Sequence, residues 1–336
     1  MLLVTGGAGY IGSHVCLALA EAGRDFVVLD DLSTGNHRVF QRIFQLTGVK
    51  VPLIVADICD KASLVDLFQK YQIDAVLHFA AKKSIAESII KPHIYYSVNV
   101  LGLMNLCEVM HNFSINKMVF SSSATVYGDC THVPVSEQEP TNRATNPYGS
   151  TKLIGEQFLF ELCAARKYFS TAILRYFNPI GAHSSGEIGE HVIGKPSNLV
   201  PYLLKVASGQ LERLTVYGND YPTSDGTGVR DYIHVVDLAR GHLHALDALN
   251  VKSGMNVWNL GTGKGYSVLQ LIHTFEQVTG LSVPIKLAAR RDGDVASSYA
   301  DVRKAKSELN WSAEADLYQM LSDAWRWHQK YPNGYL

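Results

Sequence analysis

The chain has 336 residues, of which 47% are hydrophobic and 18% are charged, and its formal net charge is −1. These values are typical of a globular protein with room for one large domain and one smaller domain. A charge this close to zero gives no general attraction to nucleic acid or to an anionic membrane, so we expect neither as a partner.

Cysteine, histidine and apolar patterns exclude further classes of protein. The five cysteines are scattered and contain no CxxC pair, which argues against a disulfide framework or a structural zinc site. The thirteen histidines form no HExxH or comparable set, so no metal is expected. The first apolar run ends too early for a signal peptide, and no apolar stretch approaches the roughly 20 residues that span a bilayer. We therefore expect a cytoplasmic protein.

Short apolar runs alternate with helical patterns over the first half of the chain. The pattern predicts strands at 2–5, 26–29, 53–55, 75–79, 117–121 and 171–175. It predicts helices at 11–22, 61–70, 94–111 and 148–166. This alternation indicates a Rossmann-type α/β fold, in which ligands bind at the carboxyl ends of a doubly wound parallel sheet.

The pattern loosens after residue 178, where Gly and Pro become common. Short strands at 214–217 and 257–260 mix with helices near 198–208, 235–249, 267–279 and 315–330. We predict a large domain at 1–177, to which part of the later chain returns, and a smaller mixed α/β domain at 178–336 that binds the substrate.

A glycine-rich loop lies between the first expected strand and the first expected helix. It reads Gly6-Gly-Ala-Gly9-Tyr-Ile-Gly12, and glycines at this spacing allow a tight turn and close approach of the backbone to a pyrophosphate. The following helix offers free N–H groups to the phosphates. Asp30 ends the next strand, where it would bind the adenosine ribose hydroxyls and repel a 2′-phosphate. The sequence therefore predicts NAD rather than NADP as the cofactor.

Two other strand-end features are less informative. Asp57-Ile58 follows the third strand, where an adenine edge is expected, but a polar residue that merely ends a strand explains Asp57 equally well. Gly261-Thr-Gly-Lys-Gly265 is a second glycine cluster, yet no acid follows it by about twenty residues and Walker spacing is absent. We interpret it as a loop.

Tyr148 and Lys152 are four residues apart in an expected helix, so they lie on one face of it. A nearby ammonium stabilises a phenolate and would lower the phenol pKa from about 10 toward neutrality. Such a phenol can act as general base at a hydroxyl carbon. Ser123 lies upstream in a run of three serines, 121–123, and chemistry alone does not choose among the three.

Together these motifs resemble the extended short-chain dehydrogenase/reductase family, and within it the UDP-glucose (UDP-galactose) 4-epimerases. The resemblance covers essentially the whole chain. It is carried by residues 5–14, 79–83, 121–128, 146–152, 174–179, 217–223, 225–234 and 290–294.

The resemblance implies a role for each matching position. Tyr148 would be the base, Ser123 would hydrogen-bond the sugar O4, and Lys152 would contact the nicotinamide ribose and set the charge of Tyr148. Further NAD contacts would be Tyr10, Ile11, Asp30, Asp57, Ile58, Phe79, Ala80, Lys83 and Phe177. The UDP-sugar would contact Asn178, Asn198, Leu199, Tyr217, Arg230, Arg291 and Asp294. Two arginines suit a diphosphate, although either could instead be a solvated surface charge.

The implied reaction is NAD-dependent epimerisation at C4 of UDP-glucose and UDP-galactose through a 4-keto intermediate. A nucleotide-sugar 4,6-dehydratase would need an Asp-Glu pair where this chain has Ala124-Thr125, and neither can perform that acid/base work. A dehydrogenase with an exchangeable cofactor is disfavoured only by the resemblance. An NAD-sensing regulator is disfavoured because Tyr148 and Lys152 are both present.

Substrate breadth and assembly are the remaining expectations. Among relatives a bulky Tyr at the position of Ser298 closes the sugar pocket, so Ser298 predicts that N-acetylated UDP-sugars are also accepted. A shift of one residue would place Tyr299 there instead. Helices 94–111 and 148–166 resemble those that form a homodimer interface, and their apolar residues suit either that interface or the core: Tyr95, Val98, Met104, Leu153, Phe158 and Leu162.

Overall fold

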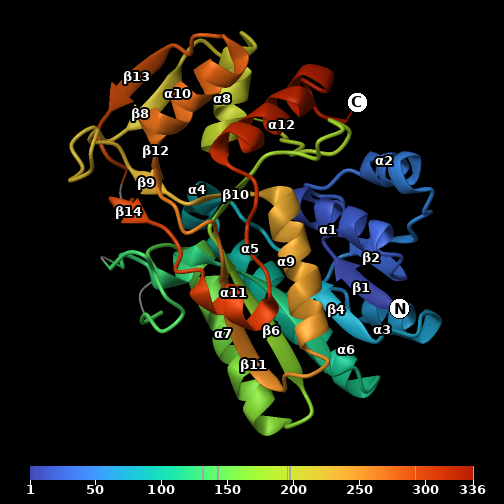
Figure 1. The fold of residues 1–336 in the computed structure, drawn as a ribbon. Coiled ribbons are helices and arrows are strands. Elements are labelled where there is room, and N and C mark those ends of the chain that lie inside the picture. Colours follow the sequence, from blue (N-terminus) through green and yellow to red (C-terminus); the bar gives the residue numbers. More distant parts are fainter. Residues whose placement is uncertain (131, 142–143, 195, 197, 292, 336) are drawn as a thin grey trace. The chain divides into compact units, whose positions relative to one another are not determined.

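The structure is a computed structural model that describes residues 1–130, 132–141, 144–194, 196, 198–291 and 293–335 (Figure 1). The chain divides into two compact units. Unit 1 comprises Met1–Gly128, Pro140–Arg175 and Ala239–Trp258, and unit 2 comprises Asp129–Glu139, Tyr176–Leu238 and Asn259–Leu336. The later segment that belongs to unit 1 is thus Ala239–Trp258, and the segment Asp129–Glu139 belongs to unit 2.

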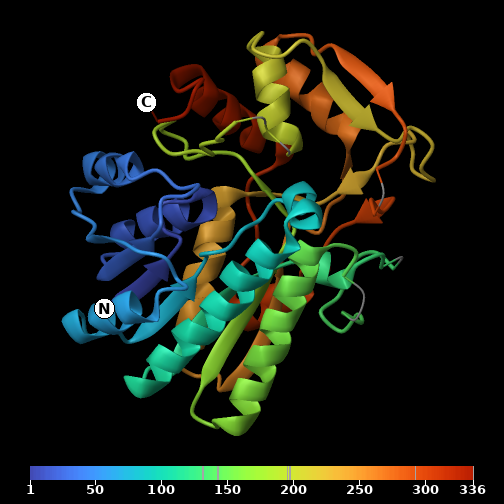
Figure 2. The same ribbon diagram turned by 180° about the vertical axis from the view of Figure 1, so that it is seen from behind.

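Unit 1 is built on a seven-stranded sheet with the strand order β3-β2-β1-β4-β5-β6-β11. The pairs from β3 to β5 are parallel. Helices α1 and α9 lie on one face of the sheet (Figure 1) and α6 and α7 on the other (Figure 2). The order reverses between β1 and β4, which is the place where ligands bind in open α/β sheets. The expected doubly wound Rossmann-type fold is confirmed.

The elements of unit 1 follow the hydrophobic pattern closely. The strands are β1 (Leu2–Thr5), β2 (Phe26–Asp30), β3 (Leu53–Val55), β4 (Ala75–His78), β5 (Lys117–Ser123), β6 (Ser170–Tyr176) and β11 (Gly254–Leu260). The helices are α1 (Tyr10–Glu21), α2 (Arg38–Thr47), α3 (Lys61–Lys70), α4 (Ile85–Ile90), α5 (Pro92–Tyr96), η1 (Ser97–Leu101), α6 (Gly102–Asn112), η2 (Ala124–Tyr127), α7 (Pro147–Ala165) and part of α9 (Val235–Ala248).

The expected helix 94–111 is interrupted. It consists of α5, the π-helical segment η1 and α6. Tyr95, one of the residues that suited either an interface or the core, is fully buried and hydrogen-bonds Glu87 through its hydroxyl at 3.0 Å. It therefore belongs to the core. Met104 on α6 is exposed.

Unit 2 contains smaller sheets around its own core. Its strands are β7 (Asn178–Ile180), β8 (Leu214–Tyr217), β9 (Val229–Arg230), β10 (Tyr232–His234), β12 (Tyr266–Ser267), β13 (Ile285–Ala288) and β14 (Ser297–Ser298). Its helices are α8 (Leu199–Ala207), α10 (Val268–Thr279), α11 (Arg303–Leu309) and α12 (Leu317–Lys330), and α9 begins in it. Leu203, Phe275 and Met320, from α8, α10 and α12, share one buried apolar cluster.

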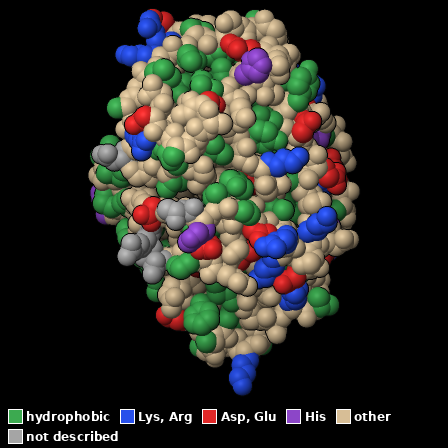
Figure 3. Space-filling model, turned by 60° about the vertical axis from the view of Figure 1, so that its left-hand side comes forward, with side chains coloured by type: hydrophobic (Ala, Val, Ile, Leu, Met, Phe, Trp, Pro, Cys, Tyr) green, Lys and Arg blue, Asp and Glu red, His purple; other side chains and the backbone are tan. Residues whose placement is uncertain are grey.

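The surface is mixed in charge. Figure 3 shows acidic and basic side chains beside one another on the face that it draws. In unit 1 such contacts include Arg24 with Asp247, at 2.9 Å, and Lys61 with Glu108. Within the described residues, no helix is both long and apolar enough to cross a membrane. All five cysteines are free thiols.

Candidate active site

Two positions of the glycine loop after β1 are packed too tightly for any residue other than glycine. A Cβ on Gly6, whose φ is +73°, would lie 2.6 Å from the Ala80 backbone nitrogen, and a Cβ on Gly12 would lie 2.2 Å from the Gly6 oxygen. Helix α1 starts after Gly9 with neither a side-chain cap nor an acidic residue in its first turn. No capping side chain or acidic side chain therefore competes with an anion at this helix N-terminus, as a pyrophosphate site requires.

Asp30 stands at the end of β2 beside this loop. One carboxylate oxygen accepts the Ala8 N–H at 2.9 Å, and the other accepts the Leu32 N–H at 2.8 Å. Burial raises the pKa of Asp30, while these hydrogen bonds lower it. Each oxygen retains a further lone pair, so a ribose hydroxyl could still donate to the same carboxylate.

The other predicted cofactor residues of unit 1 lie at strand ends or at the start of α1. Phe79 and Ala80 follow β4, and the Phe79 N–H donates to Thr5 O at 2.9 Å. The Lys83 ammonium lies 5.8 Å from the ring centroid of Tyr10, so these two predicted contacts are neighbours. Ile11 follows Tyr10 in the first turn of α1.

Asp57 and Ile58 form the turn after β3. The Asp57 side chain accepts the Cys59 N–H at 2.8 Å. Ile58 is buried in the core of unit 1, where a Cβ on Gly102 would lie 2.6 Å from it. The Ile58 side chain thus packs in the core of unit 1, and a contact between Ile58 and NAD stays a prediction.

The sequence around Tyr148 fixes where α7 begins. Asn146 is the N-cap, and its side-chain oxygen accepts the Gly149 N–H at 2.9 Å. Pro147 occupies the first helical position, where its missing N–H costs nothing. Tyr148 therefore lies in the first turn of α7, and Lys152 follows one turn later on the same face.

The three serines at the end of β5 have separate partners. The Ser121 carbonyl accepts the Lys152 ammonium at 2.6 Å, and the Ser122 hydroxyl donates to Glu156. The Ser123 hydroxyl accepts the Thr125 N–H at 3.2 Å and the Thr125 hydroxyl at 3.0 Å, and its interaction with the Tyr148 phenol lowers the pKa of that phenol. Of the three serines, Ser123 is therefore the one whose side chain acts on the pKa of the candidate base.

The expected lowering of the Tyr148 pKa is not found in this structure. Desolvation raises the pKa of Tyr148 above its ordinary value, and the hydrogen bond with Ser123 only partly opposes that rise. The Lys152 ammonium, one turn further along α7, donates to the Ser121 carbonyl. Burial also lowers the pKa of Lys152 to about 8, against a raising effect of Glu156.

In unit 2, Arg230 and Ser298 are brought together by strand pairing. β14 pairs with β9 in parallel, and Ser298 is the register partner of Arg230. The Asp231 N–H donates to Ser298 O at 3.0 Å. The guanidinium of Arg230 donates to Val229 O at 2.8 Å, which uses one of its five N–H groups.

Tyr217, Arg291 and Asp294 form a second group in unit 2. The Arg291 guanidinium lies 5.0 Å from the Tyr217 ring centroid and donates to Asp294 at 2.9 Å. Tyr217 is 43% exposed, so its ring is available to stack on a flat ligand.

The remaining predicted residues of unit 2 lie at element ends. Asn178 begins β7, is exposed, and donates its N–H to Asp231 O at 2.9 Å. Phe177 precedes it and is buried. Asn198 is the N-cap of α8 without a side-chain cap hydrogen bond, and Leu199 is the first residue of that helix.

Comparison with known proteins agrees with this geometry. A family model described as GDP-mannose 4,6 dehydratase matches residues 3–324. A UDP-glucose 4-epimerase of Bacillus subtilis (strain 168) is 51% identical over 334 residues, which are 99% of this chain and 98% of that protein. The chain belongs to the UDP-glucose 4-epimerase family.

Solved structures of this family superpose closely. A UDP-glucose 4-epimerase from Stenotrophomonas maltophila, with bound NAD and formylated UDP-arabinopyranose, has a TM-score of 0.96 at 48% identity and covers 98% of each chain. One from Bifidobacterium longum, in complex with NAD+ and UDP, has a TM-score of 0.96 at 45% identity and covers 99% of each chain.

Asn99 lies near the candidate site, and the sequence did not predict it. It lies in the π-helical segment η1, and its side chain accepts the Lys82 N–H at 2.8 Å. It also donates to Lys82 O and to Thr151 Oγ1, both at 3.0 Å. Asn99 thus ties the segment after β4 to α7 near Tyr148. The only signal in the sequence was a polar Asn between two valines, Val98 and Val100. The structure adds that this Asn is buried in a π-helical turn, and such turns are frequent at functional sites.

Asp231 was also missed, and it explains the second glycine cluster. Its carboxylate accepts the N–H and hydroxyl of Thr262 at 2.8 and 2.6 Å, the Gly263 N–H at 3.0 Å and the Ala300 N–H at 3.1 Å. A Cβ on Gly261 would lie 2.5 Å from the same carboxylate. The cluster is a loop, as expected, and it is built around Asp231.

Tyr221 is the third residue that was missed. Its ring lies 4.2 Å from the Arg290 guanidinium. Burial raises the pKa of the Tyr221 phenol, as does Asp294, whereas three nearby arginines, Arg290, Arg230 and Arg291, lower it. Its hydroxyl is buried and has no hydrogen-bond partner among the described residues. The Tyr221 hydroxyl could therefore donate a hydrogen bond to an anion that the neighbouring arginines attract.

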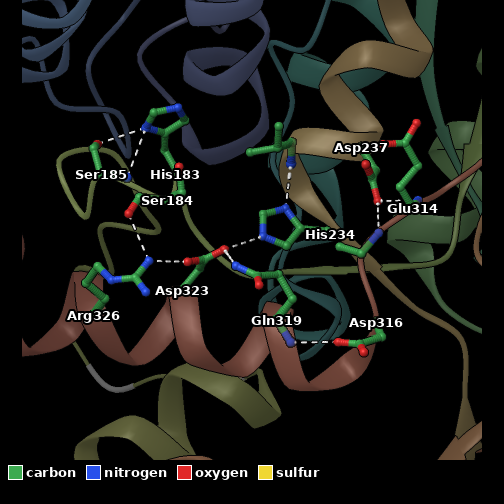
Figure 4. A network of polar contacts seen from close by, with 12 residues as sticks. His183, Ser184, Ser185, His234, Asp237, Glu314, Asp316, Gln319, Asp323 and Arg326 are labelled. Carbon is green, nitrogen blue, oxygen red and sulfur yellow. Dashed lines mark hydrogen bonds and ion pairs between the residues drawn. The ribbon is translucent and has the colours of Figure 1, made fainter.

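A buried His–Asp pair in unit 2 resembles catalytic machinery but is structural (Figure 4). His234 Nε2 contacts Asp323 at 3.2 Å, while His234 Nδ1 accepts the Val236 N–H at 3.0 Å. Gln319 and Arg326 also bind the Asp323 carboxylate. Both nitrogens of His234 are occupied, so the pair connects β10 to α12 and offers no free base.

Cys130, His132 and Glu139 form a group that could hold a metal ion. Their ligand atoms lie within 4.8 Å of one another. The His132 side chain is 82% exposed, so an ion there would sit at the surface. It is the only such group among the described residues, and none of its three members was a predicted site residue.

Proposed function

We propose that this chain is an NAD-dependent epimerase that interconverts UDP-glucose and UDP-galactose at C4 through a 4-keto intermediate. The observation that supports it most is the contact of Ser123 with Tyr148 one turn before Lys152, in the unit that also carries the glycine loop and Asp30. The names of the relatives in the family point to the same activity.

The unit 1 residues suit NAD. The α1 N-terminus, with Gly6, Gly9 and Gly12, would receive the pyrophosphate, and Asp30 would bind the adenosine ribose. Bound there, NAD would supply reversible hydride acceptance at the sugar C4. The side-chain and backbone groups of Tyr10, Ile11, Asp57, Ile58, Phe79, Ala80 and Lys83 would complete these contacts, and Phe177, which belongs to unit 2, is a further predicted NAD contact.

The chain's own acid/base work falls to two residues. Tyr148 takes the proton from the 4-hydroxyl and later returns it to O4, and Ser123 hydrogen-bonds the same oxygen. Lys152 supplies a positive charge one turn away, which favours the phenolate. Burial opposes that phenolate, so the ammonium and the Ser123 hydrogen bond must act together.

The unit 2 residues suit the UDP handle that retains a 4-keto sugar. Arg230 and Arg291 would neutralise the diphosphate through planar guanidinium groups. Tyr217 would stack on the uracil, and Asp294 orients Arg291. Asn178, Asn198 and Leu199 would complete the contacts. With UDP held, the keto sugar can turn over and present its other face.

Ser298 supports a wider substrate range within this function. It is the register partner of Arg230, and a Ser side chain is much smaller than the Tyr that closes the sugar pocket among the relatives that this chain resembles. We propose that UDP-GlcNAc and UDP-GalNAc are also substrates.

A 4,6-dehydratase is the second candidate, since the matching family model carries that description. The residues after Ser123 are Ala124 and Thr125, in η2. The Thr125 hydroxyl donates to Ser123 at 3.0 Å, and neither side chain can act as an acid or base at C5 and C6. The structure thus offers no group for dehydration at this place.

We further propose that the protein is a cytoplasmic homodimer. The helices that resemble the family's interface carry exposed apolar side chains on η1, α6 and α7, including Leu101, Met104 and Ile154. Exposed apolar groups on neighbouring helices are typical of an interface. Sedimentation at micromolar concentration should give twice the 37.0 kDa chain mass.

A panel of UDP-sugars, with bound cofactor quantified, tests the function. Turnover of UDP-glucose to UDP-galactose without added NAD is expected. Release of a UDP-4-keto-6-deoxy sugar would instead establish the dehydratase. Retained NAD with no turnover of any UDP-sugar would refute the enzyme and favour the NAD-sensing regulator.

A further inference from the structure

Glu156 is a buried carboxylate on the face of α7 that carries Tyr148 and Lys152. The three residues follow one another at intervals of four, so their side chains lie in one row along the helix. Glu156 and Lys152 are each 3% exposed. A carboxylate this deeply buried is rare unless it is paired, so its position needs a physical explanation.

Arg175 of β6 and Ser122 of β5 hold this carboxylate. The Arg175 guanidinium donates to both oxygens, with Nε at 3.0 Å from Oε1 and Nη2 at 2.6 Å from Oε2. Ser122 donates a further hydrogen bond to Oε1. Arg175 also donates to the Tyr127 hydroxyl at 3.0 Å and lies 4.8 Å from its ring centroid. A two-pronged contact of this kind fixes the carboxylate in one orientation.

Lys152 is the other cation close to this carboxylate. Its ammonium donates to Ser121 O and lies 5.0 Å from the Phe120 ring centroid. His78 on β4 faces it, but burial and the charge of Lys152 lower the pKa of His78 to about 3, so that ring is neutral. Glu156 is thus the anion that acts on Lys152.

Among the described residues, the elements that pack most closely against α7 supply no second carboxylate to Lys152. η1 and η2 contain no charged residue. On α4, Glu87 binds the Tyr95 hydroxyl at 3.0 Å and Lys91 at 3.7 Å, and His93 on α5 is exposed. On β5, Lys117 binds Asn250 at 2.7 Å.

We propose that Glu156, fixed by Arg175 and Ser122, is a positioning residue that keeps Lys152 charged and directed at the Ser121 carbonyl at neutral pH. Without the carboxylate, Lys152 and Arg175 would be two buried cations with no anion between them. Lys152 would then lose its proton, and Tyr148 would lose the charge that favours its phenolate. The inference rests on the proposed function only in assigning Tyr148 and Lys152 to the reaction.

Glu156→Gln tests this directly, because it keeps the size of the side chain and removes the charge. NMR titration of protein labelled with [ε-13C]lysine would follow the Lys152 signal, identified by its absence in Lys152→Met. We expect the pKa of Lys152 to fall by about one relative to the wild type. An unchanged pKa would refute the proposal, and this measurement needs no substrate.

The pH profile of turnover gives the second readout. In Glu156→Gln the fall in kcat on the alkaline side should move to lower pH by a similar amount, with KM for the UDP-sugar changed less than twofold. Glu161→Gln on the same helix is the matched control, because Glu161 is exposed and bonds only Gln157 at 2.8 Å. Its profile should match that of the wild type.

A double variant covers the case in which Glu156→Gln does not fold. Glu156→Gln with Arg175→Gln replaces the ion pair by two amides and leaves no unpaired buried charge. It should also lower the pKa of Lys152, because the attraction to Glu156 is lost. A wild-type value in the double variant would overturn the proposal. If the wild type turns over no UDP-sugar, the proposed function fails while the NMR result still stands.

Discussion

Arg230 and Ser298 are register partners in the parallel strands β9 and β14. Partners in a parallel pair project from the same face of the sheet, and successive residues alternate between faces. Tyr299 therefore projects from the other face, where its ring lies 3.0 Å from the position of a Cβ on Gly265. If Arg230 faces the diphosphate, Ser298 shares that side, and the alternative wall residue Tyr299 does not.

Ser298→Tyr should remove turnover of N-acetylated substrates. A phenol ring would fill the space left for the acetamido group, so we expect turnover of UDP-GlcNAc to fall at least a hundredfold, or about 3 kcal/mol. Turnover of UDP-glucose should change less than threefold. Ser298→Ala is the control, because it keeps the space. Equal UDP-GlcNAc rates in wild type and Ser298→Tyr would refute the gate.

Asp30→Asn should weaken retention of NAD and admit NADP. The amide keeps one acceptor oxygen but loses the charge that repels a 2′-phosphate. We expect the preference for NAD over NADP to fall at least tenfold, or about 1.4 kcal/mol. Cofactor released from purified protein and fluorescence titration with each dinucleotide would measure it. Asp31→Asn is the matched control, since Asp31 is exposed and accepts only the Ser33 N–H at 2.9 Å.

Local patterns predicted most of the fold of unit 1. The six strands predicted in the first half of the chain end within two residues of their expected limits, because most of them are short buried apolar runs between turn residues. Helix α2 (Arg38–Thr47) was missed, since neither a side-chain cap nor an acidic first turn marks its start. The interruption at Ser97–Leu101 was also missed, because hydrophobic periodicity does not distinguish a π-helical turn from an α-helical one.

The candidate site could be predicted only where its residues share a local motif. Gly6 and Asp30 each follow or end a strand, and Tyr148 and Lys152 are one turn apart. Asp231 accepts hydrogen bonds from Thr262 and Ala300, which are far away in sequence. Glu156 of helix α7 pairs with Arg175 of strand β6 in the same way. Such long-range polar partners follow from the topology and leave no local signal.

Tyr221→Phe should weaken binding of the UDP-sugar without lowering the stability of the fold. The hydroxyl is buried and without a partner among the described residues, so removing it should leave the thermal midpoint unchanged or slightly higher. If the hydroxyl binds the UDP moiety, KM for UDP-glucose should rise about tenfold, which corresponds to about 1.4 kcal/mol, with kcat nearly constant. Tyr318→Phe, on the exposed side of α12, is the control. An unchanged KM would remove Tyr221 from the site.

His78 should make the protein less stable in acid. Its pKa is lowered to about 3 by burial and by the charge of Lys152, whereas an unfolded chain binds the proton near pH 6.5. Between these values the unfolded state holds one proton more, so the free energy of unfolding falls as the pH drops from about 6.5 toward 3. The slope is at most about 1.4 kcal/mol per pH unit for this group.

His78→Asn, which can still hydrogen-bond Thr5, should reduce the slope of the free energy of unfolding against pH, measured by urea unfolding between pH 6.5 and 5. His111→Asn, on the exposed side of α6, should leave it unchanged. Equal slopes in wild type and His78→Asn would show that other groups cause the acid sensitivity.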